Sequence, residues 1–381
     1  MNEALNTLLA AGQSAWLDDM GRGLIASDEL EAMIAQGLRG ATSNPTIFAK
    51  AIAHGSDYDA EIAELDDVSL DTEALFWKIA IRDVRDALDL FRPVYDASGG
   101  ADGFVSLEVA PRLAHDSQGT IAMAKDLWQK IDRPNLMIKI PGTVEGAAAI
   151  EDCTAAGLNI NVTLVFSVGM FDVAARAYAA GLQQRLERGE AIDTISSANS
   201  LFISRIDSAV DPILEARIAR GESLSDLLGE AGLAIATLCY QRYAGIFNGI
   251  GFAALRERGA RAQRPLWAST GTKNPAYADL KYVEPLIAAN TISTMPRATL
   301  AAFLEHGVVR PKPAGDAEAA QSIAHRFAMA NISLEEVSRK LQNDGIAKFD
   351  DSFSQLLDAL ARKARALRSN KTPARTNERR L

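Results

Sequence analysis

The sequence has few of the residues that build disulfide frameworks or metal centres. Only two of its 381 residues are cysteines, Cys153 and Cys239, and both lie in apolar stretches with alanines nearby. Two isolated cysteines form no disulfide framework, which favours a reducing compartment. The four histidines show no metal-ligand spacing with one another or with the cysteines. The sequence therefore indicates no metal site.

Long apolar runs and nucleotide-binding motifs are also missing. No apolar run approaches the ~20 residues that span a bilayer. The first 20 residues carry acids and no basic region, which is a poor signal peptide. The chain contains no Gly-x-Gly-x-x-Gly motif, no Walker loop and no serine in a nucleophile elbow. We therefore expect a cytoplasmic protein with no membrane partner and no metal or nucleotide cofactor.

The balance of charge is acidic, with a formal net charge of -9 and a pI of about 5.2. This balance argues against a general nucleic-acid binder or a binder of anionic membranes. It does not exclude a small anionic substrate, because a local cluster of hydrogen-bond donors is enough to bind one.

Short apolar segments alternate with longer stretches of helical periodicity. The predicted strands are 15–18, 38–43, 104–109, 136–140, 158–164, 195–202, 265–269 and 290–294. The predicted helices are 72–91, 117–131, 144–156, 171–187, 209–219, 229–247 and 350–367, with a further helix that begins after Ser27 as N-cap. We expect Pro93 to end the first of these and Gly157 to follow the third.

This alternation predicts a parallel sheet covered by helices. Eight candidate strands favour a closed (β/α)8 TIM barrel with extra helices and a C-terminal helix over an open sheet. We expect one catalytic domain over 1–369 and a polar tail over 370–381. The arginines of the tail allow an anionic partner, but a solvated chain end is the preferred interpretation.

Polar residues recur near the carboxyl ends of the predicted strands. They are Asp18, Asn44, Glu108, Lys139, Asn161, Thr163, Ser200 and Ser269. In a barrel these strand ends converge on one face, where active sites form.

Lys139 interrupts a strand that otherwise predicts complete burial. Lysine is almost never fully buried without a purpose. Burial disfavours the ammonium and favours the neutral amine that a Schiff base needs. The pattern equally allows a lysine that reaches solvent or pairs with an acid.

Asp18 and Glu108 are the candidate acid–base residues, since each ends an apolar strand at the same rim. Alternatively, Asp18 or Asp19 caps a turn, and Glu108 pairs with Arg112 or Lys139. Asn161 and Thr163, like Asn44, can orient a polyol or can satisfy strand-end hydrogen bonds.

A possible anion site follows the last strands. Its candidates are Ser200, Arg205, Ser269 and Lys273, because arginine gives a bidentate fork for phosphate that serine hydroxyls complete. The alternative for Arg205 is a surface ion pair with Asp207 or Asp211.

Five motifs in this order resemble the transaldolases, and most closely the longer bacterial branch that includes fused transaldolase–glucose-6-phosphate isomerases. They are Trp16-Leu17-Asp18-Asp19, Gly40 to Phe48 (GATSNPTIF), Val105-Ser106-Leu107-Glu108-Val109, Ile138 to Thr143 (IKIPGT) and Asn159 to Ser167 (NINVTLVFS). The similarity runs from about Leu5 to the C-terminal helix. The chain is too short for the fused isomerase domain, so we expect no isomerase activity.

The resemblance implies a role for each candidate. Lys139 is the Schiff-base lysine, Asp18 handles the C4 hydroxyl of the sugar, and Glu108 and Thr163 hold a catalytic water. Asn44 and Asn161 bind the dihydroxyacetone moiety, and Ser200, Arg205 and Ser269 form the phosphate pocket. In shorter transaldolases an arginine closely follows the last serine; here the loop continues to Lys273, whose placement stays open.

The resemblance also implies the reaction, which transfers a dihydroxyacetone unit between sugar phosphates in the pentose phosphate pathway without a cofactor. We expect a monomer or small homo-oligomer that binds sugar phosphates and no nucleic acid. Two alternatives stay open: a Schiff-base aldolase of similar fold that releases a free fragment, and a sugar-phosphate-binding barrel without activity.

Overall fold

Eight parallel strands form a closed barrel in the computed structural model, which describes residues 2–43, 48, 51–52, 55–65, 71–310 and 315–371. The strands are β1 (Gln13–Leu17), β2 (Gly40–Thr42), β3 (Phe104–Glu108), β4 (Leu136–Pro141), β5 (Ile160–Val165), β6 (Ser197–Phe202), β7 (Arg264–Ala268) and β8 (Thr291–Met295). The first strand pairs with both β2 and β8, which closes the sheet. The predicted TIM barrel is confirmed, and each predicted strand overlaps an observed one.

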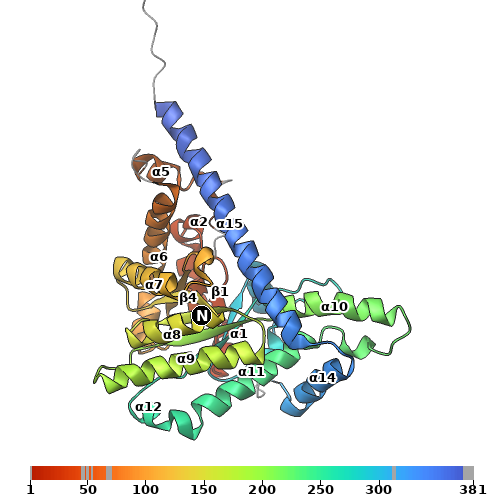
Figure 1. Ribbon diagram of the computed structural model, residues 1–381. Coiled ribbons are helices and arrows are strands. Elements are labelled where there is room, and N and C mark those ends of the chain that lie inside the picture. Colours follow the sequence, from red (N-terminus) through yellow and green to blue (C-terminus); the bar gives the residue numbers. More distant parts are fainter. Residues whose placement is uncertain are drawn as a thin grey trace, which may run out of the picture.

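Helices surround the barrel and follow most of its strands (Figure 1). The longer helices are α1 (Glu3–Ala10), α3 (Glu29–Gln36), α6 (Thr72–Ala97), α7 (Ser117–Ile131), α8 (Val144–Ala155), α9 (Val168–Glu187), α10 (Ser204–Ile218), α11 (Ala231–Phe247), α13 (Arg297–His306), α14 (Ala317–Met329) and α15 (Leu334–Lys371). The shorter ones are α2 (Arg22–Ala26), α5 (Asp59–Leu65), α12 (Ala253–Glu257) and the 3-10 turns η1 (Pro111–Leu113), η2 (Ser225–Leu227), η3 (Ile250–Phe252) and η4 (Glu284–Leu286).

Local capping explains why α7 and α8 begin where the sequence predicts. The side chains of Asp116 and Thr143 each accept a backbone N–H at the start of these helices. Ser167 caps α9 in the same way, three residues before the predicted start at residue 171. Such caps satisfy donors that have no partner within the helix. Gly157 has φ 94° after the end of α8, as its predicted role requires.

Several predicted helix boundaries are wrong, and α10 begins at Ser204 and not at residue 209. Pro93 lies inside α6, because its ring is exposed while Phe91 and Val94 stay buried on the core side. Packing of that apolar face outweighs the one hydrogen bond that proline removes. Ser27 does not cap α3; it ends α2, and Asp28 precedes α3 in the left-handed conformation without a side-chain cap bond.

The C-terminal helix α15 begins at Leu334, well before the predicted start at residue 350. Figure 1 shows it as one continuous helix that crosses the molecule, from α10 at one end to α5 at the other, and both contacts are close. The predicted tail over 370–381 overlaps the end of this helix at Lys371, and the residues beyond lie outside the described part of the chain.

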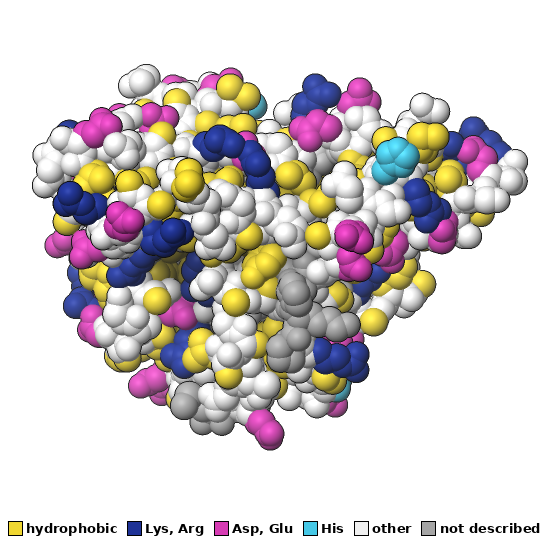
Figure 2. All heavy atoms as spheres, turned by 90° about the horizontal axis from the view of Figure 1, so that it is seen from below, with side chains coloured by type: hydrophobic (Ala, Val, Ile, Leu, Met, Phe, Trp, Pro, Cys, Tyr) yellow, Lys and Arg dark blue, Asp and Glu magenta, His cyan; other side chains and the backbone are white. Residues whose placement is uncertain are grey.

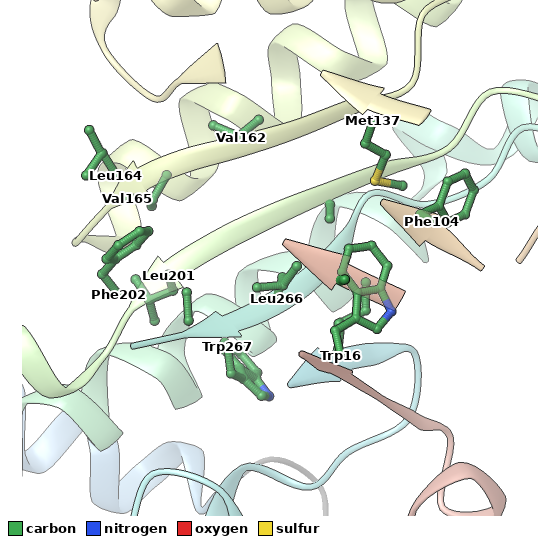
Figure 3. Packing of buried hydrophobic residues seen from close by; sticks show 14 of the residues in the cluster. Trp16, Phe104, Met137, Val162, Leu164, Val165, Leu201, Phe202, Leu266 and Trp267 are labelled. Carbon is green, nitrogen blue, oxygen red and sulfur yellow. The ribbon is translucent and has the colours of Figure 1, made fainter. Parts of the chain in front are cut away.

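Three large side chains, one each from β1, β3 and β4, pack together. Trp16, Phe104 and Met137 point toward one another in Figure 3, and the ring centroids of Trp16 and Phe104 are 6.4 Å apart. A Cβ atom at Gly40 would lie 2.5 Å from Cε2 of Trp16. The glycine is therefore required by the indole that covers it.

Lysines, arginines and acidic side chains are interspersed across the described part of the face in Figure 2. Among the described residues, no helix is both long and apolar enough to cross a bilayer.

Candidate active site

The carboxyl ends of the strands surround a cavity of about 320 Å³. Seven of the ten predicted site residues line it: Asp18, Lys139, Thr163, Ser200, Arg205, Ser269 and Lys273. Thr42, Phe202, Leu266, Ala268, Thr294, Pro296 and Phe349 complete the lining. The structure thus brings together residues from Asp18 to Phe349, which lie far apart in the sequence.

Register explains how the central residues meet. Glu108 on β3 pairs with Lys139 on β4, and Lys139 pairs with Asn161 on β5. These three residues occupy one level of the sheet at neighbouring strand positions, so their side chains project at similar height.

Lys139 is buried, with 6% of its surface exposed, and so is Glu108, with 4%. The Lys139 Nζ lies 3.0 Å from Oε2 of Glu108 and donates to the Ser43 carbonyl oxygen at 3.3 Å. Of the interpretations that the sequence left open, a lysine that extends into solvent is wrong. Glu108 pairs with Lys139 and not with Arg112, whose partner is Glu73.

Burial raises the pKa of the Glu108 carboxyl. The charge of Lys139 and its hydrogen bond act in the opposite direction, and the charge of Asp18 adds to the increase. Apolar side chains cause the burial, since Glu108 shares a small void with Phe76, Trp77 and Phe353. The protonated carboxyl is therefore favoured more than in an exposed glutamate.

Asp18 directly follows β1, and its backbone N–H continues the ladder to the Met295 carbonyl at 2.9 Å. Its Oδ1 accepts the Thr42 hydroxyl at 2.9 Å, and Thr42 lies 3.2 Å from the Thr294 hydroxyl. The side chain is half-buried and lines the cavity. The carboxylate thus faces the open space and is oriented by a hydroxyl from β2.

Asn161 and Thr163 differ in how far the protein satisfies them. The Asn161 amide donates to Ser106 Oγ at 3.0 Å, and its oxygen accepts the Ser200 hydroxyl at 2.6 Å. The Thr163 hydroxyl is buried and has no hydrogen-bond partner among the described residues. It precedes Leu164, whose φ of 58° accompanies a bulge in β5. Thr163 therefore offers a free donor and acceptor at the cavity wall.

The predicted anion-site residues gather around the ends of β6 and β7. Ser204 and Ser269 have their Oγ atoms 3.0 Å apart, and Ser269 has φ 53°. The Arg205 guanidinium lies 5.5 Å from the centroid of the Phe202 ring, and burial lowers its pKa. Lys273 is exposed at the rim.

The proposed ion pair of Arg205 with Asp207 or Asp211 is wrong. Both aspartates accept hydrogen bonds from tyrosine hydroxyls and backbone N–H groups instead. Among the described residues, no carboxylate lies within ion-pair distance of Arg205. Its charge is therefore available to a ligand.

Sequence reasoning missed several lining residues. Phe349 comes from α15, where the helical pattern gives no sign that this residue reaches a barrel mouth. Gln342 on the same helix donates to the carbonyl oxygens of Gly142 at 2.9 Å and Leu164 at 3.0 Å. Thr42 lies within a motif already quoted, next to a predicted strand end, and could have been found there. Asn44 lies outside the described residues.

Comparison with known proteins agrees with this arrangement. A family model described as Transaldolase/Fructose-6-phosphate aldolase matches residues 15–360. A transaldolase of Thiobacillus denitrificans is 46% identical over 347 residues, which is 91% of this chain and 96% of the relative. A transaldolase of Saccharopolyspora erythraea is 44% identical over 361 residues, 94% of this chain and 97% of the relative. One from Thermobifida fusca is 43% identical over 368 residues, 96% of this chain and 100% of the relative.

Proposed function

The chain belongs to the transaldolase/fructose-6-phosphate aldolase family and is an enzyme of the transferase class, and we propose that it transfers a dihydroxyacetone unit through a Schiff base on Lys139. The observation that carries this proposal is the Lys139–Glu108 pair, buried at the mouth of the barrel beside an open cavity. A lysine with a purely structural role at a strand end would not require a buried carboxylate partner beside a cavity.

The reaction needs a neutral amine at Lys139. Glu108 lies 3.0 Å from the Lys139 nitrogen, and burial raises the pKa of its carboxyl, so Glu108 is placed to accept the proton of the ammonium. The amine then attacks the carbonyl carbon of a ketose phosphate, Glu108 gives its proton to the departing hydroxyl, and the loss of water leaves a protonated imine.

Bond cleavage follows from the imine. Asp18 takes the proton of the C4 hydroxyl, the bond between C3 and C4 breaks, and its electron pair moves into the imine to form an enamine. The aldose phosphate leaves as an aldehyde. The enamine carbon then adds to the aldehyde carbon of a second aldose, whose oxygen takes the proton back from Asp18. Water hydrolyses the new imine and releases the product ketose and the amine.

The remaining residues bind and orient. We assign Glu108 and Thr163 to the water that enters and leaves at the imine, supported by the unpaired Thr163 hydroxyl. We assign Asn161, together with Asn44, to the dihydroxyacetone hydroxyls. The scheme uses no metal or organic cofactor, because the protonated imine itself is the electron sink.

The phosphate end of the substrate is assigned to Ser200, Arg205, Ser269 and Lys273. Arg205 supports this assignment most strongly, since it is half-buried at the cavity and has no carboxylate within ion-pair distance among the described residues. A guanidinium in such a position binds phosphate through two parallel hydrogen bonds. Lys273 at the rim adds a second positive charge.

The substrates that fit this scheme are sedoheptulose 7-phosphate or fructose 6-phosphate as donor and glyceraldehyde 3-phosphate or erythrose 4-phosphate as acceptor, in the pentose phosphate pathway. We infer a monomer or small homo-oligomer that acts on sugar phosphates and on no nucleic acid. We also infer a cytoplasmic location, supported by Cys153 and Cys239, which are buried and unpaired.

Reductive trapping tests the nucleophile. The enzyme is incubated with fructose 6-phosphate, reduced with borohydride, digested and analysed by mass spectrometry. We expect a three-carbon adduct on the peptide that contains Lys139, and no adduct in Lys139→Ala. That variant should keep its far-UV circular dichroism spectrum and lose turnover; transfer at a normal rate would refute the assignment.

A second assay separates transfer from aldol cleavage. Fructose 6-phosphate is supplied with and without erythrose 4-phosphate. A transaldolase converts the donor only when the acceptor is present, because the enamine stays on the enzyme. Steady release of dihydroxyacetone without acceptor would make the chain an aldolase.

A further inference from the structure

Two aspartate–tyrosine hydrogen bonds outside the cavity connect two segments of the assigned phosphate pocket. Helix α10 begins at Ser204 and carries Arg205, while the loop 269–290 carries Lys273. On α10, Asp207 and Asp211 contact Tyr282 and Tyr277 of that loop. We call these four residues the aspartate–tyrosine clamp.

The contacts of the clamp are short and symmetrical. The Tyr282 hydroxyl donates to Oδ2 of Asp207 at 2.8 Å, and the Tyr277 hydroxyl donates to Oδ2 of Asp211 at 2.7 Å. The other oxygen of each carboxylate accepts a backbone N–H just before or at the start of α11, from Gly232 at 2.8 Å and Gly229 at 2.9 Å. Each aspartate thus ties the loop and α11 to α10.

Both carboxylates are buried, with 1% of Asp207 and 6% of Asp211 exposed. Neither has a lysine or arginine within ion-pair distance among the described residues. The charge of Lys281 acts on Asp207, but its Nζ lies over the Tyr277 ring at 4.7 Å and 4.0 Å from Glu230. A buried carboxylate without a cation is costly unless its hydrogen bonds are well made. These contacts therefore fix the geometry strongly.

The clamp is close enough in the chain to fix the position of Arg205. Asp207 lies two residues after Arg205, in the first turn of α10. On the cavity side the same two segments meet again, where the Ser204 and Ser269 hydroxyls are 3.0 Å apart and the Ser204 N–H donates to the Ser269 carbonyl at 3.3 Å. The segments are thus fastened at both ends, with Arg205 between the two fastenings.

Hydrogen bonds within the loop also hold the turn that carries Lys273. Between Lys273 and Tyr277 the chain turns back, and the Thr272 hydroxyl donates to the carbonyl oxygens of Ala278 at 2.9 Å and Asp279 at 3.1 Å. Displacement of Tyr277 would therefore move the short turn that carries Lys273.

We propose that Tyr277 and Tyr282, through Asp211 and Asp207, are positioning residues that hold Arg205 and Lys273 at the spacing required by the substrate phosphate. This inference rests on the proposed function. Neither tyrosine lines the cavity, so neither is expected to touch the substrate.

The test compares two acceptors that differ only in the phosphate. With sedoheptulose 7-phosphate as donor, kcat/KM is measured for D-glyceraldehyde 3-phosphate and for unphosphorylated D-glyceraldehyde. In a two-step transfer this constant depends on the acceptor alone and not on donor binding. For Tyr282→Phe and Tyr277→Phe we expect kcat/KM to fall about tenfold with the phosphorylated acceptor, mainly through KM, and less than twofold with glyceraldehyde.

Tyr178→Phe is the matched control. The Tyr178 hydroxyl is also buried, but it donates to the Ile195 and Arg261 carbonyl oxygens at 3.2 and 3.0 Å, before β6 and β7. This variant also removes a buried tyrosine hydroxyl, but one whose hydrogen bonds do not involve α10 or the loop 269–290. We expect an unchanged ratio of the two constants in this variant.

Each outcome is decisive. If both acceptors lose activity equally in the clamp variants, or if the ratio matches that of Tyr178→Phe, the clamp is merely structural and the inference is wrong. Should Tyr282→Phe fail to fold, Tyr277→Phe at a half-buried position carries the same test. Absence of any transfer by the unaltered enzyme would instead refute the proposed function.

Discussion

Removal of either member of the Lys139–Glu108 pair should reveal how strongly the two depend on each other. We consider Lys139→Met and Glu108→Gln, which keep side-chain volume, and the double variant. Loss of one partner of a buried pair costs about 3 to 5 kcal/mol when the other stays charged, whereas replacing both is close to neutral. We therefore expect each single variant to lose about 3 kcal/mol at pH 8 and the double variant about 1 kcal/mol.

The pH dependence follows from Glu108. Burial raises its pKa above the ordinary value of 4.5, and Lys139→Met removes the main opposing influence. A carboxyl whose pKa is higher in the folded state stabilises the fold below its unfolded pKa and loses that contribution as pH rises through the folded value. Lys139→Met should thus be more stable at pH 5 than at pH 8, and adding Glu108→Gln should abolish the difference.

Urea unfolding measures these quantities, with the buried Trp16 and Trp267 as fluorescent reporters and circular dichroism as the second probe. The reasoning is refuted if the two single losses add within about 0.5 kcal/mol in the double variant, since independent sites behave in that way. A Lys139→Met variant without any slope between pH 5 and pH 8 would also refute it.

Three further variants probe the barrel and its helices. Gly40→Ala should lose about 2 to 3 kcal/mol in urea unfolding, because the new methyl group meets the Trp16 ring; an unchanged midpoint would mean that the indole moves freely. Gln342→Ala should lose about 1 to 3 kcal/mol and lower kcat, because two buried carbonyl oxygens, including that of Leu164, lose their donor; Gln342→Glu, which cannot donate, serves as its companion. Asp207 has its pKa raised to about 6 by burial, so wild-type stability should fall by up to about 3 kcal/mol as pH rises from 4 to 7, and Asp207→Asn should lack this slope.

The barrel was predictable because its strands are short, continuous and apolar, and because capped helices separate them. Helix α7 matches its prediction at both ends, since Asp116 caps its start and Asp132 leaves the helix in the left-handed conformation. Helix boundaries without such signals differ from the prediction. The helix that contains Pro93 continues to Ala97, because its buried face continues. Packing, which a sequence pattern does not reveal, decides these ends.

Half of the cavity lining was predictable for a topological reason. The closed barrel brings polar residues in or just after the carboxyl halves of its strands to the same rim, so the chain position of Asp18 or Thr163 suffices to locate it. The contribution of α15 was not predictable, because Gln342 and Phe349 lie on a helix whose pattern resembles that of any amphipathic helix. Its path across the barrel depends on contacts between residues far apart in sequence.

Surroundings, and not residue type, distinguish the two carboxylates at this mouth. Glu108 lies against apolar side chains, and its Oε2 contacts the Lys139 nitrogen. Asp18, in contrast, is half-buried, faces the cavity and accepts a hydrogen bond from the Thr42 hydroxyl. Burial raises the pKa of the Glu108 carboxyl, and the charge of Asp18 adds to the increase. In the proposed mechanism Glu108 therefore holds and returns a proton at the imine, while Asp18, which faces the cavity, handles the hydroxyl proton of the substrate. The two carboxylates take different roles because their neighbours differ.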